Sequence, residues 1–162
     1  GENGYRSRLL QAVEDVNNDQ KDVLVNKVKG RFGEDLSGRT FAVWGLSFKP
    51  DTDDMRQSPA ITVIRRLTDA GALVRAYDPK AVEEARSCYL KGNDRVTYCD
   101  SKYEALKDAD ALILVTEWKE FRIPSWPVLE KIMRTPVVFD GRNIYDKREF
   151  EGTSVVYCCI GG

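Results

Sequence analysis

The chain has 162 residues, of which 42% are apolar and 31% are charged, and its formal net charge is −1. This composition is ordinary for a globular domain, and the small net charge gives no general attraction to nucleic acid or to an anionic membrane. No apolar run approaches the roughly 20 residues that span a bilayer, and residues 1–6 lack a signal-peptide pattern. We therefore expect a cytoplasmic protein with one domain and an appendage, without nucleic-acid or membrane partners.

The chain contains four cysteines and no histidine. Without histidine, the usual zinc patterns and the Ser-His and Cys-His nucleophile pairs are excluded. No two cysteines have the CxxC spacing of a redox or zinc motif. We expect buried, reduced thiols at Cys88, Cys99, Cys158 and Cys159.

Residues 5–30 are predicted to form one long amphipathic helix. Apolar residues recur there at three- and four-residue steps, and Gly30 and Gly33 are stop signals. A helix of about 26 residues is roughly 39 Å long, and it must bury its apolar stripe against another body. We expect that body to be a preceding domain together with a second subunit. The alternative is the chain's own sheet.

Beyond a polar hinge at residues 34–39, which is the predicted domain boundary, strands and helices alternate. The predicted strands are 40–44, 73–77, 96–99, 111–115, 137–139 and 154–158. The predicted helices are 58–70, 80–90, 101–107 and 125–134. This alternation predicts an α/β fold: a Rossmann-like, doubly wound, mostly parallel sheet of about six strands, preceded by the long helix. Functional groups should then gather beyond the carboxyl ends of the strands.

The loop after the first strand does not carry a dinucleotide fingerprint. A G-x-G-x-x-G turn is expected there in a dinucleotide-binding unit, but this chain has only Gly45. Asp78 ends the second strand, where a ribose-binding acid would stand. Without the glycines, we interpret Asp78-Pro79 as a turn and helix start instead of a ribose site.

Two cations in this loop, Lys49 and Arg56, are candidate anion ligands. Each could hold a phosphate or a carboxylate, Lys49 as a point charge and Arg56 as a fork. They could instead pair with the three aspartates between them on a solvated loop. The aspartates have the pattern D-x-D-D, which lacks the glycine and the distal glutamate of a calcium loop, so no metal site is predicted.

Two further residues lie at the same predicted sheet edge. Gly141 permits a sharp turn that would let Arg142 point across the crevice, and a third cation there suits an anion with more than one phosphate. An ordinary exposed arginine is the alternative. Trp118 follows the central strand. We expect its ring to cover the core, and the alternative is that it stacks against a ligand.

Residues 45–59 read GLSFKPDTDDMRQSP and resemble the signature of the nucleotide-sugar dehydrogenases. The resemblance continues in order through the sequences VEDVNNDQK at 13–21, AYDP at 76–79, LVTEW at 114–118 and FDGR at 139–142. The Thr-Glu-Trp element and residues 52–54 favour the UDP-glucose branch of the family. The alternatives are the GDP-mannose and UDP-N-acetylmannosamine branches, or a free-standing nucleotide-binding module without catalysis.

The resemblance implies that the complete enzyme has further domains besides those in this chain. Enzymes of the family have an N-terminal NAD-binding domain, a helical middle with a catalytic cysteine, and a C-terminal UDP-binding domain. Residues 1–36 would then be the end of the middle, dimer-forming helical domain, and residues 37–162 the UDP-binding domain. The implied activity is a two-step oxidation of UDP-glucose to UDP-glucuronate for polysaccharide biosynthesis, with NAD bound mainly by another domain. No cysteine here matches the catalytic one, so the fragment alone should be inactive.

The same resemblance assigns roles to four residues. By family role, Phe48 and Lys49 contact the nucleotide sugar, and Arg142 contacts the substrate. Arg56 would reach the NAD pyrophosphate across the domain cleft. No catalytic residue and no metal ligand is assigned within the chain.

Overall fold

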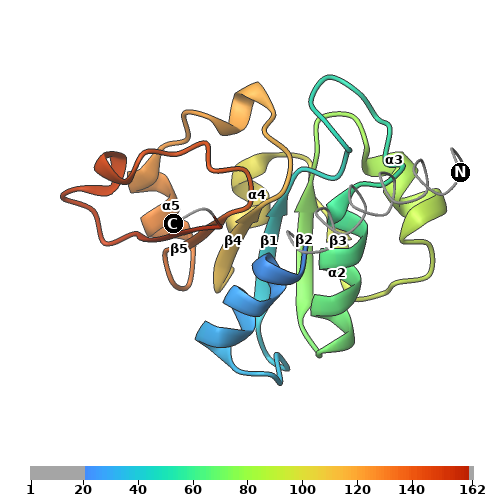
Figure 1. The fold of residues 1–162 in the computed structure, drawn as a ribbon, viewed down its shortest axis with the longest axis horizontal. Helices are drawn as coiled ribbons and strands as arrows, with labels where there is room; N and C mark the ends of the chain where they lie inside the picture. The colour runs from blue at the N-terminus through green and yellow to red at the C-terminus, as the bar shows by residue number, and fades with distance from the viewer. Residues whose placement is uncertain (1–20, 161–162) are drawn as a thin grey trace, which may run out of the picture.

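The computed structural model describes residues 21–160, and Figure 1 shows their arrangement. Residues 21–32 are helical, in agreement with the C-terminal part of the predicted long helix, whereas its residues 5–20 lie outside the described part. Among the described residues, no helix is long and apolar enough to cross a membrane.

One sheet of six parallel strands forms the centre of the molecule (Figure 1). The strands are β1 (Thr40–Trp44), β2 (Leu73–Tyr77), β3 (Val96–Tyr98), β4 (Ala111–Leu114), β5 (Val137–Asp140) and β6 (Val156–Cys159). Their order in space is β3-β2-β1-β4-β5-β6, which is the doubly wound order with a switch point between β1 and β4. The predicted fold class is therefore confirmed. The last strand begins two residues later than predicted, and the ends of β3, β4, β5 and β6 each differ by one residue.

Serine caps start three of the connecting helices, as helix starts prefer. The helical elements are α2 (Pro59–Asp69), α3 (Val82–Glu84), the π-helical turn η1 (Ala85–Tyr89), α4 (Lys102–Leu106), the 3₁₀ turn η2 (Lys119–Phe121), α5 (Trp126–Ile132) and the 3₁₀ turn η3 (Lys147–Phe150). Ser58, Ser101 and Ser125 accept backbone N–H groups at the starts of α2, α4 and α5. The helix predicted over 80–90 is shorter in the structure, where α3 is followed directly by the π-helical turn η1.

Apolar side chains cover both faces of the sheet. On one face, α2 and the helix at residues 21–32 contribute to the first buried cluster, with Leu24, Val25 and Val28 from the latter helix. On the other face, α4 and α5 close a second cluster that contains the stacked rings of Trp44 and Phe121. Leu24, Val25 and Val28 of the described part of the first helix therefore pack on the chain's own sheet, which was the alternative.

Candidate functional site

The loop after β1 leaves the sheet at the switch point, through a glycine that no other residue could replace without strain. Gly45 has φ +99°, in the left-handed region that favours glycine. A Cβ there would lie 2.5 Å from Cβ of Thr116, which follows β4. The tight approach brings the loops after β1 and β4 together at the carboxyl edge of the sheet, where open α/β sheets bind ligands.

Asp78, at the end of β2, holds this loop in place. Its carboxylate is 3% exposed, and its Oδ2 accepts the backbone N–H groups of Leu46 at 2.7 Å and Ser47 at 3.1 Å, and the indole N–H of Trp118 at 3.1 Å. Its Oδ1 accepts the N–H groups two and three residues further on, at 2.8 Å each. The carboxylate is fully used within the chain, which agrees with the turn interpretation and leaves no acceptor for a ribose.

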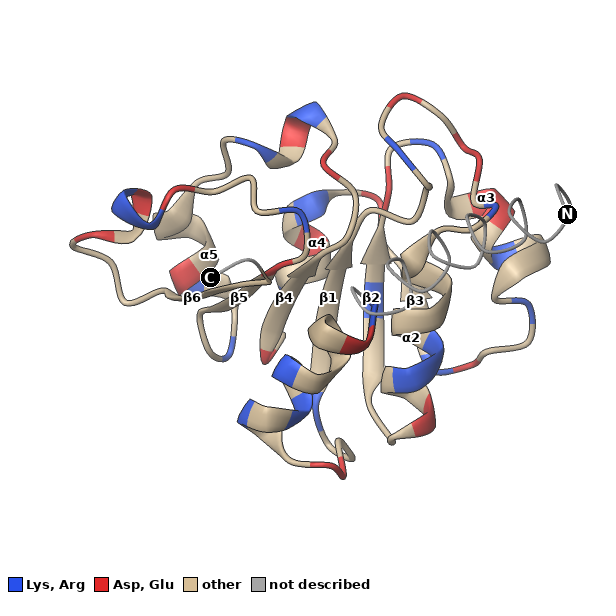
Figure 2. Ribbon diagram, in the orientation of Figure 1, with Lys and Arg blue, Asp and Glu red and all other residues tan. Residues whose placement is uncertain are grey.

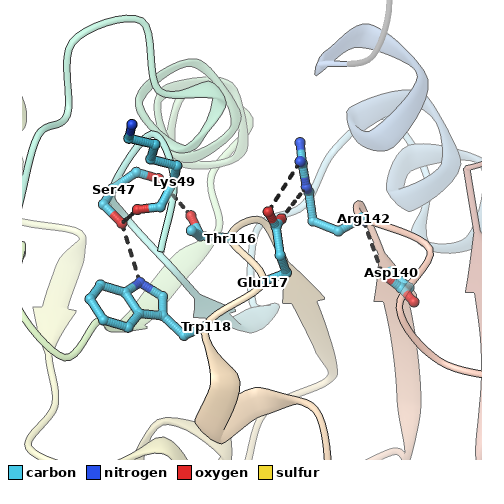
Figure 3. A network of polar contacts seen from close by, with 7 residues as sticks. All are labelled: Ser47, Lys49, Thr116, Glu117, Trp118, Asp140 and Arg142. Atoms are coloured by element: carbon cyan, nitrogen blue, oxygen red, sulfur yellow. Dashed lines mark hydrogen bonds and ion pairs between the residues drawn. The ribbon is translucent and has the colours of Figure 1, made fainter. Parts of the chain in front are cut away.

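Trp118 is part of the core, as the sequence predicted. The ring is 6% exposed, and its Nε1 also lies 3.2 Å from Ser47 Oγ. Next to it, Thr116 Oγ1 donates to Ser47 O at 2.6 Å, and Ser47 Oγ donates to Lys49 O at 2.8 Å (Figure 3). The backbone up to Lys49 is therefore fixed by hydrogen bonds from two other loops.

Beyond this anchored segment the loop presents two exposed side chains. The Phe48 side chain is 45% exposed, although its backbone N–H donates to Asp54 O at 2.7 Å. Lys49 is exposed, and no residue in the described part of the chain forms an ion pair with its ammonium group. Figure 3 shows the Lys49 side chain pointing away from the strands. Lys49 is thus an exposed cation on a fixed backbone, and its charge contributes to the lowered pKa of Asp54.

Arg56 lies in a different environment, because it is paired with Asp54. Its Nε and Nη2 bind the two carboxylate oxygens at 3.1 and 3.0 Å, and the Arg56 side chain is 80% exposed. Hydrogen bonds from Arg56 lower the pKa of Asp54 to about 2. The solvated-loop alternative therefore describes Arg56 but not Lys49. Figure 2 shows both basic and acidic segments on this loop.

Arg142 reaches the edge from β5 on the turn at Gly141. A Cβ on Gly141 would lie 2.6 Å from Leu114 O, so the close approach requires glycine. The Arg142 backbone N–H donates to the buried Asp140 at 2.9 Å. Its guanidinium is bound by Glu117, with Nε on Oε2 and with Nη2 on Oε1 at 3.3 Å (Figure 3). The predicted position of Arg142 is correct, but it is not a free cation.

Sequence reasoning assigned no role to Glu117 or Lys21. Glu117 was recognised only as part of the motif after the central strand, and its position at the shared edge was the one available signal. Lys21 lies on the helix at residues 21–32 and lines a narrow hollow of about 20 Å³ beside Arg142. The other residues that line this hollow are Leu24, Pro59, Val115 and Gly141.

The cysteines follow the expectation only in part. All four are free thiols. Cys99 is buried, and burial raises the pKa of its thiol. Cys88 lies exposed on η1, which contradicts the expected burial, because the π-turn directs residues 86–88 to the surface. No group of three or more potential metal ligands occurs among residues 21–160.

This edge does not provide a complete dinucleotide site. The chain lacks a G-x-G-x-x-G turn. The acid that would hold a ribose, Asp78, has no oxygen free to accept a ribose hydroxyl, because its two oxygens already accept five N–H groups. The Arg56 side chain is exposed at this edge and is paired with Asp54.

Comparisons with known proteins identify the same family along most of the chain. The model of the UDP-glucose/GDP-mannose dehydrogenase family, UDP binding domain, matches residues 42–147. UDP-glucose 6-dehydrogenases from Pseudomonas aeruginosa and Rhizobium meliloti are 42% and 44% identical, over 98% and 95% of this chain but only 35% and 34% of their own length. The chain therefore spans about a third of these relatives.

Solved structures of nucleotide-sugar dehydrogenases are also similar to this chain. A UDP-glucose dehydrogenase from the archaeon Pyrobaculum islandicum has a TM-score of 0.75 and 32% identity, over 93% of this chain and 31% of that one. The UDP-N-acetyl-mannosamine dehydrogenase Cap5O from S. aureus has a TM-score of 0.70 and 27% identity, over 98% of this chain and 34% of that one. Since the family model covers more than half of the sequence, the chain belongs to the UDP-glucose/GDP-mannose dehydrogenase family and contains its UDP-binding domain.

Proposed function

We propose that the chain is the UDP-sugar-binding part of an NAD-dependent UDP-glucose 6-dehydrogenase, which oxidises UDP-glucose to UDP-glucuronate. The proposal rests on the relatives named for that activity and, above all, on Lys49. An exposed cation on a rigid loop at the switch point is suited to a diphosphate. The chain's own part is to bind and orient the nucleotide sugar, and the nucleophile and nicotinamide site belong to the rest of the enzyme.

The proposed roles of individual side chains follow their environments. Lys49 holds the diphosphate, and the exposed ring of Phe48 packs against the ligand. Arg142 contacts the substrate. Arg56, which projects from the loop beside Asp54, contacts the pyrophosphate of NAD when another domain closes over this edge.

The fixed backbone beneath Lys49 supports this function energetically. Binding costs conformational freedom, and a loop that is already held in its bound shape loses less of it. Asp78 and Thr116 supply that restraint through buried hydrogen bonds. The arrangement therefore favours a site that is formed before the ligand arrives.

The wider proposals concern the complete protein. We propose that residues 1–36 belong to a helical domain that forms a homodimer, that residues 37–162 form the UDP-binding domain, and that the enzyme serves polysaccharide biosynthesis in the cytoplasm. The relatives' names support the activity. The dimer is tested by light scattering of the chain with and without residues 1–36.

Calorimetry tests the binding site. UDP and UDP-glucose should bind the 162-residue chain, and Lys49→Ala should weaken both by about tenfold, roughly 1.4 kcal/mol. The exposed Lys91 forms no described side-chain contact, so Lys91→Ala is the matched control and should bind as the wild type does. A wild-type chain that does not bind UDP, or that prefers GDP, contradicts the proposal, and so does equal loss in both variants.

A further inference from the structure

The Glu117–Arg142 ion pair joins two backbone segments that buried hydrogen bonds hold in place. On the Glu117 side, the flanking Thr116 and Trp118 are each fixed in buried hydrogen bonds to the loop after β1. On the Arg142 side, the backbone N–H is fixed by Asp140, whose other oxygen accepts Tyr157 Oη at 2.7 Å. The backbone on both sides of the pair is therefore anchored, and the two side chains meet at the surface on these fixed bases.

The pair retains both donors and acceptors after its internal bonds are made. Glu117 uses the Nε and Nη2 of the guanidinium, and an arginine has five N–H donors. The two N–H groups on Nη1 therefore have no described partner. A carboxylate has about four acceptor positions, of which Arg142 occupies two. The side chains of Glu117 and Arg142 are 21% and 40% exposed, so these unused groups are accessible.

A donor and an acceptor side by side match a hydroxyl group, which both donates and accepts. They do not match a phosphate, because an anion placed against Arg142 would also lie close to the Glu117 carboxylate, and like charges repel. Lys21 adds a cation beside Arg142, but it lies on the helix at residues 21–32, and Glu117 still lies on the Lys49 side of Arg142 (Figure 3). Lys49, whose ammonium group forms no ion pair with a described residue, is the better phosphate ligand.

We propose that Glu117 and Arg142 together bind a hydroxyl group of the nucleotide sugar, which makes Glu117 a specificity-determining residue. The inference rests on the proposed function and divides the site in two. Lys49 binds the charged diphosphate, and the ion pair distinguishes ligands by their hydroxyl groups. The hydroxyl belongs either to the ribose or to the hexose, and the experiment separates these two sources.

The test compares three ligands on the 162-residue chain by calorimetry: UDP, 2′-deoxy-UDP and UDP-glucose. The variant is Glu117→Gln, which keeps the size of the side chain and removes its charge. Glu151 is exposed and forms no described side-chain contact, so Glu151→Gln is the matched control. Thermal unfolding shows whether each variant is folded, and Glu117→Asp, which restores the carboxylate, should recover part of the discrimination.

Each result supports or overturns the inference. If the hydroxyl is on the ribose, the wild type prefers UDP to 2′-deoxy-UDP, and Glu117→Gln reduces that ratio by about tenfold or more. If it is on the hexose, the same loss affects the ratio of UDP-glucose to UDP. Equal changes for all three ligands, or no preference in the wild type, overturn the inference while UDP binding itself stands. A wild type that does not bind UDP removes the proposed function instead.

Discussion

The indole N–H of Trp118 and the carboxylate of Asp78 meet at 3.1 Å beneath the candidate site. They come from the loops after β4 and β2, and the backbone of the loop after β1 donates to the same Asp78 oxygen. Asp78 is therefore the residue on which the position of Lys49 depends.

Replacing Asp78 should cost both stability and binding. Asp78→Asn keeps the size and shape of the side chain, but one of its oxygens becomes an NH₂ group that faces N–H donors. We therefore expect the free energy of unfolding to fall by about 2–4 kcal/mol. We also expect UDP to bind more weakly. Urea unfolding and calorimetry measure the two effects. The same change at the exposed Asp108 should have little effect on either. Equal stability of the two variants would contradict the role given to Asp78.

Gly45 provides a second test of the same junction. Gly45→Ala adds a Cβ at 2.5 Å from Thr116 in a backbone with φ +99°, so strain and overpacking together should cost roughly 3 kcal/mol or more. Gly92 has φ +83° but open space around it, so Gly92→Ala should cost only about 1 kcal/mol of strain. The urea midpoints of the two variants are compared, because both variants carry the backbone strain but only Gly45→Ala adds the contact with Thr116. Similar midpoints would show that the Thr116 contact is unimportant.

The sequence predicted the strands well because their apolar runs are typical of a parallel sheet covered on both faces. It also placed Lys49, Arg56 and Arg142 at one edge, since the carboxyl ends of parallel strands meet there. It did not reveal their partners. Whether Arg142 is free depends on the direction of the Glu117 side chain, a tertiary contact between loops 25 positions apart that no local pattern encodes.

The short helices were harder to predict for a local reason. Residues 80–90 contain good helix formers, but the α-helical turn at 82–84 passes into a π-turn, which carries Cys88 to the surface. The period of a helix pattern does not distinguish such a turn from a regular helix. The sequence indicated a turn at Asp78, but only the structure shows that the carboxylate is buried and which N–H groups surround it.

The Arg56–Asp54 pair makes a prediction about pH. Hydrogen bonds from Arg56 hold the folded pKa of Asp54 at about 2, below its ordinary value of 3.8. The contribution of this group to stability is therefore present above pH 4 and is lost as the pH falls toward 2. In Arg56→Gln the Asp54 pKa should return toward 3.8, as followed by NMR titration of the carboxyl carbon.

The same titration contains its own control. Hydrogen bonds from Arg148 hold the pKa of Asp146 at about 2 on η3, and Arg56→Gln should leave that value unchanged. An Asp54 pKa that stays near 2 in the variant would show that Arg56 is not its cause. Arg56 would then be freer to bind a cofactor than the structure indicates.

The helix at residues 21–32 gives the last prediction, which concerns what covers its apolar stripe. Leu24 is 4% exposed and lies in the cluster on the chain's own sheet, whereas Val23 on the same helix is 38% exposed. Leu24→Ala should therefore cost about 2–5 kcal/mol, and Val23→Ala should cost under about 0.5 kcal/mol. Urea unfolding at several protein concentrations measures both. Equal and concentration-dependent losses would instead mean that a second copy of the chain covers this helix, because only an interface between copies makes stability depend on concentration.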